Sequence, residues 1–273
     1  LKEEENFELN VERLLTELDG DVGLFIACNP NNPTGNYNPL EAMEKILANV
    51  SCPVVMDEAY MEFAKGSGVD PQDLRPLNKL KLVAGSTLAL TAKYSNFMCL
   101  RTFSKAYGLA GLRVGYAVGS AGIMRILGKT LLPYHVNAWS LVVAEEVYRQ
   151  KDVYKERIET ITEQRELLRE QFEQLGLKVW PSATNFLTIC PQGRLAKHLA
   201  VAFSKEYGPQ GDKTEQMLAG MYLYRKLLAN KILVRDYTGH PVLQGCLRIT
   251  MGLPQENAEV ALQLSRLCGE EEA

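Results

Sequence analysis

Short apolar runs alternate with amphipathic segments along the first half of the chain, and polar side chains follow the apolar runs. DVGLFIAC (21–28), CPVVMDEAY (52–60) and RVGYAVG (113–119) predict buried strands. NPLEAMEKILANV (38–50) predicts a helix with Asn38 as N-cap and Pro39 at its first position, and ELNVERLLTELD (8–19) predicts an earlier helix. Strands that alternate with helices predict an α/β fold with a doubly wound, mostly parallel sheet.

The pattern changes from about Asn137. AWSLVVAEEVYRQ (138–150) and the charged run 151–176 predict two helices, and the Arg and Glu residues between 155 and 173 predict a solvated helix face. Short strands are predicted at NFLTIC (185–190), KILVRDY (231–237) and CLRITMG (246–252), with a last helix from Pro254. We therefore expect a large domain over 1–150 and a small C-terminal α+β domain over 151–273. Residues 65–95 and 204–230 give no assignment.

Composition excludes several classes of protein. The 273 residues carry a net charge of −3 and are 46% hydrophobic, which is ordinary for a globular protein and does not favour nucleic acid or an anionic membrane as partner. No apolar run approaches the ~20 residues of a membrane helix. The six cysteines form no CxxC pair and the three histidines lie far apart, so we expect no metal site and the reduced thiols of a cytoplasmic protein.

Two segments resemble nucleotide-binding motifs without matching them. VVMDEAY (54–60) resembles a Walker B strand, and GIMRILGKT (122–130) resembles a phosphate-binding loop. Five residues separate the glycines of the second segment, where the loop needs four, and IMRIL predicts a helix. An NTPase is therefore disfavoured, and the lack of a GxSxG segment gives a serine hydrolase little support.

RTFSKAYGLAGLRVGY (101–116) places cations in a segment of small and apolar residues. A lysine flanked by cations, as Lys105 is, can form a Schiff base with an aldehyde cofactor. A phosphate on that cofactor needs a fixed cation and hydroxyl donors, which Arg113, Thr102 and Ser104 can supply. The segment therefore favours pyridoxal 5′-phosphate.

The pyridine ring of this cofactor makes two further demands. Its nitrogen needs a carboxylate to stay protonated, and Asp57 follows a buried strand directly. Its phenolic oxygen needs donors, and Asn32 and Tyr60 are available after neighbouring strands. Because ligands of such sheets bind at the carboxyl ends of the strands, we expect these side chains to share one site.

Five segments in this order resemble fold-type I pyridoxal-phosphate aminotransferases, and most closely the histidinol-phosphate aminotransferases. They are NPNNPTG (29–35), DEAYMEF (57–63), RTFSKAYGLAGLRVGY (101–116), ILVRDY (232–237) and LRITMG (247–252). The resemblance implies that Lys105 is the Schiff-base lysine, that Asp57 pairs with the ring nitrogen, and that Asn32 and Tyr60 bind the ring oxygen. It also implies that Thr102, Ser104 and Arg113 bind the cofactor phosphate, and that Arg235 and Arg248 bind the acidic groups of the substrate.

The resemblance further implies a reaction. L-histidinol phosphate and 2-oxoglutarate would give imidazole acetol phosphate and L-glutamate, a step of histidine biosynthesis, in a cytoplasmic homodimer without nucleic-acid or membrane partners. Two alternatives stay open: an aromatic amino acid aminotransferase of the same family, and a non-catalytic remnant of the fold that acts as a binding or assembly module.

The sequence also departs from the family pattern. It opens LKEEENFELN without an initiator Met, and it lacks the N-terminal segment that supplies a loop for the cofactor phosphate, a ring-stacking aromatic and a tyrosine donated across the dimer. We expect weak activity from this chain alone. The links from Phe63 to Arg101 and from Phe203 to Lys231 are longer than usual, and His135 and Asn185 receive no role.

Overall fold

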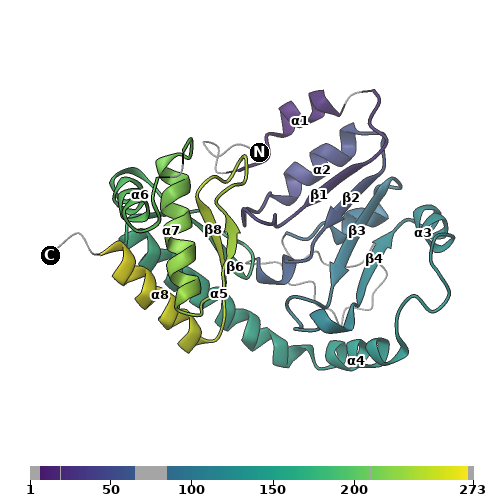
Figure 1. Ribbon diagram of the computed structural model, residues 1–273. Coiled ribbons are helices and arrows are strands. Elements are labelled where there is room, and N and C mark those ends of the chain that lie inside the picture. The colour runs from purple at the N-terminus through teal and green to yellow at the C-terminus, as the bar shows by residue number, and fades with distance from the viewer. Residues whose placement is uncertain (1–6, 19, 65–84, 210, 270–273) are drawn as a thin grey trace. The chain divides into compact units, whose positions relative to one another are not determined.

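The computed structural model describes residues 7–18, 20–64, 85–209 and 211–269, which belong to two compact units (Figure 1). Unit 1 comprises Phe7–Asn32 and Asn36–Glu159, and unit 2 comprises Pro33–Gly35 and the described residues from Thr160 onward. The two units therefore divide inside a long helix. The domain boundary expected between residues 150 and 151 stays a prediction.

Unit 1 contains a four-stranded sheet in the order β1-β2-β3-β4. Its strands are Phe25–Cys28 (β1), Val54–Asp57 (β2), Phe97–Thr102 (β3) and Gly115–Gly119 (β4). β1, β2 and β3 pair in parallel, and β4 runs antiparallel to β3. The predicted α/β class with a mostly parallel sheet is confirmed.

The sequence analysis predicted neither β3 in unit 1 nor the short β5 (Leu177–Val179) in unit 2. The residues of β3, FMCLRT, follow the stretch 65–95 that gave no assignment, and the last two of them belong to the RTFSK segment. The first two residues of that segment are therefore the end of a central strand. Most of the stretch before it, residues 65–84, lies outside the described residues.

The helices of unit 1 are α1 (Val11–Glu17), α2 (Leu40–Asn49), α3 (Ala121–Gly128) and α4 (Ala138–Arg149), with 3-10 turns at Met61–Phe63 (η2), Leu88–Ala92 (η4) and Ala110–Leu112 (η5). α3 contains the IMRIL stretch, so the helix predicted there is confirmed. The prediction that Asn38 caps α2 is wrong, because Pro39 is the N-cap and no side chain caps the helix. Asn38 is instead buried in a contact with another loop.

Unit 2 contains an antiparallel sheet in the order β5-β6-β8-β7. The strands are Leu177–Val179 (β5), Phe186–Pro191 (β6), Arg235–Tyr237 (β7) and Cys246–Thr250 (β8). The helices are α5 (Lys151–Gln174), which begins in unit 1, and α6 (Gly193–Tyr207), α7 (Glu215–Ala229) and α8 (Pro254–Cys268). α6, α7 and α8 lie on one side of the sheet (Figure 1), so this part is the α+β arrangement expected. The unassigned stretch 204–230 contains the end of α6 and the whole of α7.

One face of the unit 1 sheet is closed and the other is more open. Val54 and Met56 of β2 and Phe97 and Cys99 of β3 point to the closed face, where they pack against α2 and η4. Side chains alternate between the faces of a strand. Asp57 therefore points to the other face, where the side chain of Ile26 is 61% exposed.

α5 is less solvated than its charge pattern predicted. The Arg165 side chain is buried, and its Nη1 atom donates a hydrogen bond of 2.7 Å to the carbonyl oxygen of Thr184. Arg169, one turn later, forms the surface pairs that the pattern indicated, with Glu166 and Glu173. The prediction is wrong for Arg165 because its contacts come from a segment distant in sequence.

A buried asparagine pair holds the loop after β1. The side chain of Asn29, which is 0% exposed, donates to the carbonyl oxygen of Asn38 at 2.9 Å and accepts from the amide nitrogen of Asn38 at 2.8 Å. The side-chain oxygen of Asn38 accepts from the amide of Leu9. The loop thus acquires a defined shape before it reaches Asn32.

Asn29→Ala should therefore destabilise unit 1. The substitution leaves a buried amide and a buried carbonyl of Asn38 without these partners, which costs about 2–4 kcal/mol in the free energy of unfolding. The matched control is Asn49→Ala at the exposed end of α2, expected within about 0.5 kcal/mol of the unmutated chain. Denaturant titration measures both values. Equal values for the two variants would contradict this account.

Candidate functional site

The ends of three parallel strands form the candidate site in unit 1. Cys28, Asp57 and Leu100 lie abreast in the registers of β1, β2 and β3. The ladder continues one residue further, because Asn29 donates its amide to Asp57 and Glu58 donates its amide to Leu100. The loops that contain the NPNN, DEAY and TFSK segments therefore leave the sheet at one edge, where ligands of such sheets bind.

Asp57 is held by the turn that follows β2. Its side chain is half-buried, and its Oδ1 atom accepts a hydrogen bond of 2.9 Å from the amide of Ala59. Burial and then the nearby Asp57 carboxylate raise the pKa of the Cys28 thiol on β1. Asp57 thus presents a fixed anion at the strand ends.

Lys105 lies in the turn after β3, and its side chain is exposed. Its Nζ atom is 5.4 Å from the centroid of the Tyr60 ring, a cation–π distance. Tyr60 itself is buried at 7% exposure, so the ring is a fixed surface for the amine. The structure brings together these two residues from different segments of the predicted site.

Two hydroxyl groups precede Lys105. Thr102 Oγ1 donates to Ser104 Oγ at 2.9 Å and accepts from the Ser104 amide at 3.1 Å. This local arrangement fixes the turn that carries Lys105. It also places two hydroxyls next to each other as donors for an anion.

Arg113 and Asn32 complete the predicted set in unit 1. Arg113 follows η5 in a left-handed conformation, with φ 56° and ψ 43°, and its exposed side chain donates to the carbonyl oxygen of Ala110 at 3.1 Å. A left-handed conformation is uncommon outside glycine and is often retained at functional sites. Asn32 is exposed in the loop after β1. All seven residues predicted to contact the cofactor therefore belong to unit 1.

The chemistry of this set fits pyridoxal phosphate. Thr102, Ser104 and Arg113 would hold its phosphate, Lys105 offers a primary amine to its aldehyde, and the Asp57 carboxylate suits a protonated ring nitrogen. The described residues contain no group of three or more His, Cys, Asp or Glu side chains that could hold a metal ion.

The two predicted substrate arginines lie in unit 2, directly opposite each other. Arg235 on β7 pairs with Arg248 on β8 in the antiparallel register. The guanidinium carbon of Arg248 lies 4.8 Å from the centroid of the Phe186 ring. Opposite residues share one face of a sheet with Cβ atoms about 5 Å apart, and like charges there repel. An anionic ligand on this face would offset that repulsion.

Two residues without a predicted role lie in loops. The exposed ring of His135 is 3.1 Å, through Nδ1, from the carbonyl oxygen of Leu132. The carbonyl oxygen of Asn185 accepts a hydrogen bond from the amide of Met251 at the end of β8. Neither contact assigns a chemical role.

Sequence reasoning also passed over a buried polar cluster beneath the strand ends. The sequence analysis gives no role to Arg101 or to Glu58. In the structure these two residues form a buried ion pair, with 2.9 Å between Arg101 Nε and Glu58 Oε2. Strand alternation was the available signal, because it places Glu58 on the face opposite Asp57.

None of the described helices is long and apolar enough to cross a membrane. Each of the six cysteines is a free thiol. The structure therefore contains no disulfide.

Comparisons with known proteins give one family. The model of the family described as "Aminotransferase class I and II" matches residues 1–264. The histidinol-phosphate aminotransferase of Ruminiclostridium cellulolyticum is 30% identical over 272 residues, which are 98% of this chain and 63% of that protein. This chain therefore spans somewhat less than two thirds of the length of that curated relative.

Solved structures share the fold. The histidinol-phosphate aminotransferase of Sinorhizobium meliloti, in complex with pyridoxal-5′-phosphate, has a TM-score of 0.72 at 24% identity, covering 96% of this chain and 62% of that one. A decarboxylase from Sulfurospirillum multivorans has a TM-score of 0.75 at 20% identity, covering 98% and 68%. The fold by itself thus accompanies more than one reaction.

The strained position of Arg113 gives a test of the predicted phosphate site. Arg113→Gly and Arg113→Ala both remove the guanidinium, which should weaken binding of pyridoxal phosphate by about 1.5–3 kcal/mol. Glycine tolerates the left-handed conformation, so the free energy of unfolding of Arg113→Gly should be about 1 kcal/mol higher than that of Arg113→Ala. Cofactor titration and denaturant titration measure the two effects. If both variants bind the cofactor as tightly as the unmutated chain, Arg113 does not bind the cofactor phosphate.

Proposed function

This chain belongs to the family of class I and II aminotransferases, and on that premise we propose that it is part of a pyridoxal-phosphate-dependent aminotransferase. The proposed amino donor is L-histidinol phosphate and the proposed acceptor is 2-oxoglutarate, with imidazole acetol phosphate and L-glutamate as products. The observation that carries the proposal is the position of Lys105 against Tyr60, directly after the Thr102–Ser104 hydroxyl pair. The relative from Ruminiclostridium cellulolyticum supports the choice of donor.

The predicted site residues of unit 1 divide the tasks of this proposal among them. When bound, the cofactor supplies an aldehyde for the amine and a ring that withdraws electrons. Lys105 holds the aldehyde through its amine and, once released, carries a proton to or from the substrate carbon. Asp57 keeps the proton on the ring nitrogen, and this interaction strengthens as negative charge develops in the transition state. Asn32 and Tyr60 donate to the ring oxygen.

The arginine pair of unit 2 supports a phosphorylated donor. A phosphate carries more negative charge and more acceptor oxygens than a carboxylate, and a guanidinium binds it through two parallel hydrogen bonds. Arg235 and Arg248 provide two such groups on one sheet face. A donor with a single carboxylate would need only one of them.

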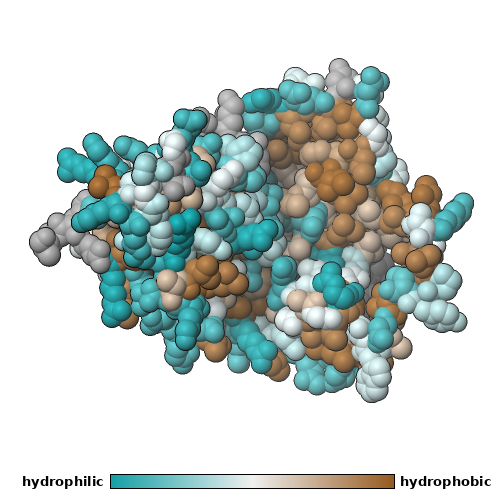
Figure 2. All heavy atoms as spheres, viewed as in Figure 1, coloured by the Kyte–Doolittle hydropathy of each residue, from teal (hydrophilic) through white to brown (hydrophobic). Residues whose placement is uncertain are grey.

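The proposal includes a homodimer in the cytoplasm, without nucleic-acid or membrane partners. Unit 1 supports an interface, because large hydrophobic side chains are exposed on it from α3 to the first turn of α4. Ile126, Leu132, Tyr134 and Trp139 are 66%, 75%, 98% and 76% exposed. Figure 2 shows hydrophobic residues gathered over unit 1, at the right of the view. Apolar patches of this kind mark interaction surfaces.

The first test is the attachment of the cofactor. Borohydride reduction of the complete gene product with pyridoxal phosphate should fix the pyridoxyl group on Lys105, as peptide mapping would show. Lys105→Ala should remove this label and abolish turnover, whereas Lys129→Ala at the exposed end of α3 should retain both. A label on another lysine would refute the site. The absence of both label and turnover in the unmutated protein would favour a non-catalytic binding module.

The second test concerns the amino donor. Arg235→Ala removes one of two phosphate-binding groups, so KM for histidinol phosphate should rise by about 10- to 100-fold. KM for phenylalanine should change much less, and Lys197→Ala on the exposed side of α6 should leave both values unchanged. Initial rates at varied donor concentration measure these constants. Faster turnover of phenylalanine by the unmutated enzyme would instead favour an aromatic amino acid aminotransferase.

A further inference from the structure

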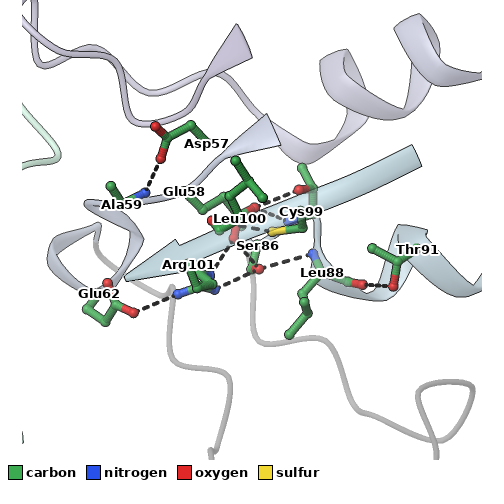
Figure 3. Close-up of polar contacts among 12 residues, drawn as sticks. Asp57, Glu58, Ala59, Glu62, Ser86, Leu88, Thr91, Cys99, Leu100 and Arg101 are labelled. Carbon is green, nitrogen blue, oxygen red and sulfur yellow. Dashed lines mark hydrogen bonds and ion pairs between the residues drawn. The ribbon is translucent and has the colours of Figure 1, made fainter. Parts of the chain in front are cut away.

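A buried polar cluster lies beneath the candidate site, on the closed face of the sheet (Figure 3). The Glu58 carboxylate, 0% exposed, is 2.9 Å from Arg101 Nε and accepts from Ser86 Oγ at 2.8 Å. Its other oxygen accepts from the amide of Thr87 at 2.6 Å and from the Thr87 hydroxyl at 2.7 Å. Glu58 thus anchors the start of η4 to the end of β2.

Arg101 extends the cluster to a third segment. Its Nη1 atom is 2.8 Å from Glu62 Oε1 in η2, and its Nη2 atom donates to Ser86 Oγ at 2.9 Å. The guanidinium of Arg101, a residue that is only 7% exposed, therefore joins the end of β3 to the turn after β2 and to the segment that enters η4. A lysine has no planar fork and could not make these contacts at once.

Stability alone does not explain this cluster. Buried charges lose their hydration, and apolar residues of similar volume often stabilise a protein as well or better. The cluster also holds two carboxylates against one cation. Burial raises the pKa of Glu62 even though Arg101 opposes the shift, while Glu58 and Glu62 raise the pKa of Arg101 against the effect of burial. Ion pairs that are costly in this way can be retained because they specify a geometry.

The cluster is adjacent in sequence to both halves of the cofactor site. Glu58 follows Asp57, and Arg101 precedes Thr102, at the point where the registers of β2 and β3 place residues 58 and 101 side by side. Because side chains alternate between faces, Glu58 and Arg101 meet on the closed face while Asp57 and Thr102 point to the open face. A displacement of the ion pair would move both of these open-face residues.

We propose that Glu58 and Arg101 are positioning residues, which fix the Asp57 carboxylate relative to the Thr102–Lys105 turn through a buried ion pair on the opposite face of the sheet. This inference rests on the proposed function, because it assigns the pair a role in aligning two residues of the proposed site. They are Lys105, which moves the proton, and Asp57, which pairs with the ring nitrogen. Neither residue contacts the reacting atoms. Their effect on the reaction is carried by the backbone of β2 and β3.

The test uses the complete gene product with cofactor and two kinds of variant. Arg101→Lys keeps a charge but loses the fork. A triple variant, Glu58→Leu with Glu62→Gln and Arg101→Met, removes all three charges of the cluster, so that no buried charge loses its partner, and this variant should fold. In single turnovers, both variants should transfer the proton from the reacting carbon of the donor about 10²-fold more slowly than the unmutated protein, and a donor deuterated at that carbon identifies this step. KM for the donor, from steady-state rates, should change far less.

Two further measurements separate positioning from a merely structural role. The first is the pH titration of the absorption band of the cofactor attached to Lys105, which should shift in both variants. The second needs no cofactor: the Ala59 amide, which donates to Asp57, should exchange its hydrogen faster. The matched control is Ile46→Val in α2, within the core that packs against the same face of the sheet. It should lower the melting temperature without changing the proton-transfer rate or the titration.

The outcomes are distinct. Variants that fold and melt at lower temperature but transfer the proton at the unmutated rate would overturn the positioning role and leave the proposed function intact. Failure to label Lys105 in the unmutated protein would overturn both. If Arg101→Lys and the triple variant both fail to fold, Ser86→Ala decides, since it removes a hydroxyl that accepts from Arg101 and donates to Glu58 and leaves all three charges in place. A proton-transfer rate and an Ala59 exchange rate unchanged in Ser86→Ala would overturn the proposal.

Discussion

The parallel pairing of β1, β2 and β3 is the constraint on which the candidate site depends. This pairing aligns Cys28, Asp57 and Leu100, so three loops from distant parts of the sequence leave the sheet at one edge. A slip of one residue in the register of β2 would turn Asp57 to the closed face and Glu58 to the open one. The apolar side chains of Val54 and Met56, packed against α2, oppose that slip.

The two faces of this sheet carry different kinds of polar chemistry. On the open face, Asp57, Lys105 and the hydroxyls of Thr102 and Ser104 remain accessible to a ligand. On the closed face, Glu58 is fully buried in contacts with Arg101 and with the start of η4. Side chains that must bind and release a ligand are thus adjacent in sequence to side chains that can fix the position of the strands. They lie on opposite faces of the sheet because successive residues of a strand point to opposite sides.

Unit 2 shows a different use of charge. Arg235 and Arg248 are neighbours on antiparallel strands, where two cations lower the stability of the sheet. In unit 1, by contrast, the Arg101 cation has two carboxylate partners. The arginine pair of unit 2 is therefore suited to an anionic ligand, and the Arg101 cluster is suited to a structural task.

The sequence by itself determined the strands β1 and β2, the helices α4 and α5, the α/β class and the segments that contain the candidate residues. These features depend on local periodicity and on residue types within one segment. The tertiary structure decided that FMCLRT is a central strand, that Asn38 joins a buried pair instead of capping α2, and that Arg165 is buried. It also decided that Arg235 lies opposite Arg248 and that Arg101 binds Glu58. The physical reason is the same in each case. Burial and strand pairing depend on side chains far away in the chain, and the local sequence pattern does not identify those partners.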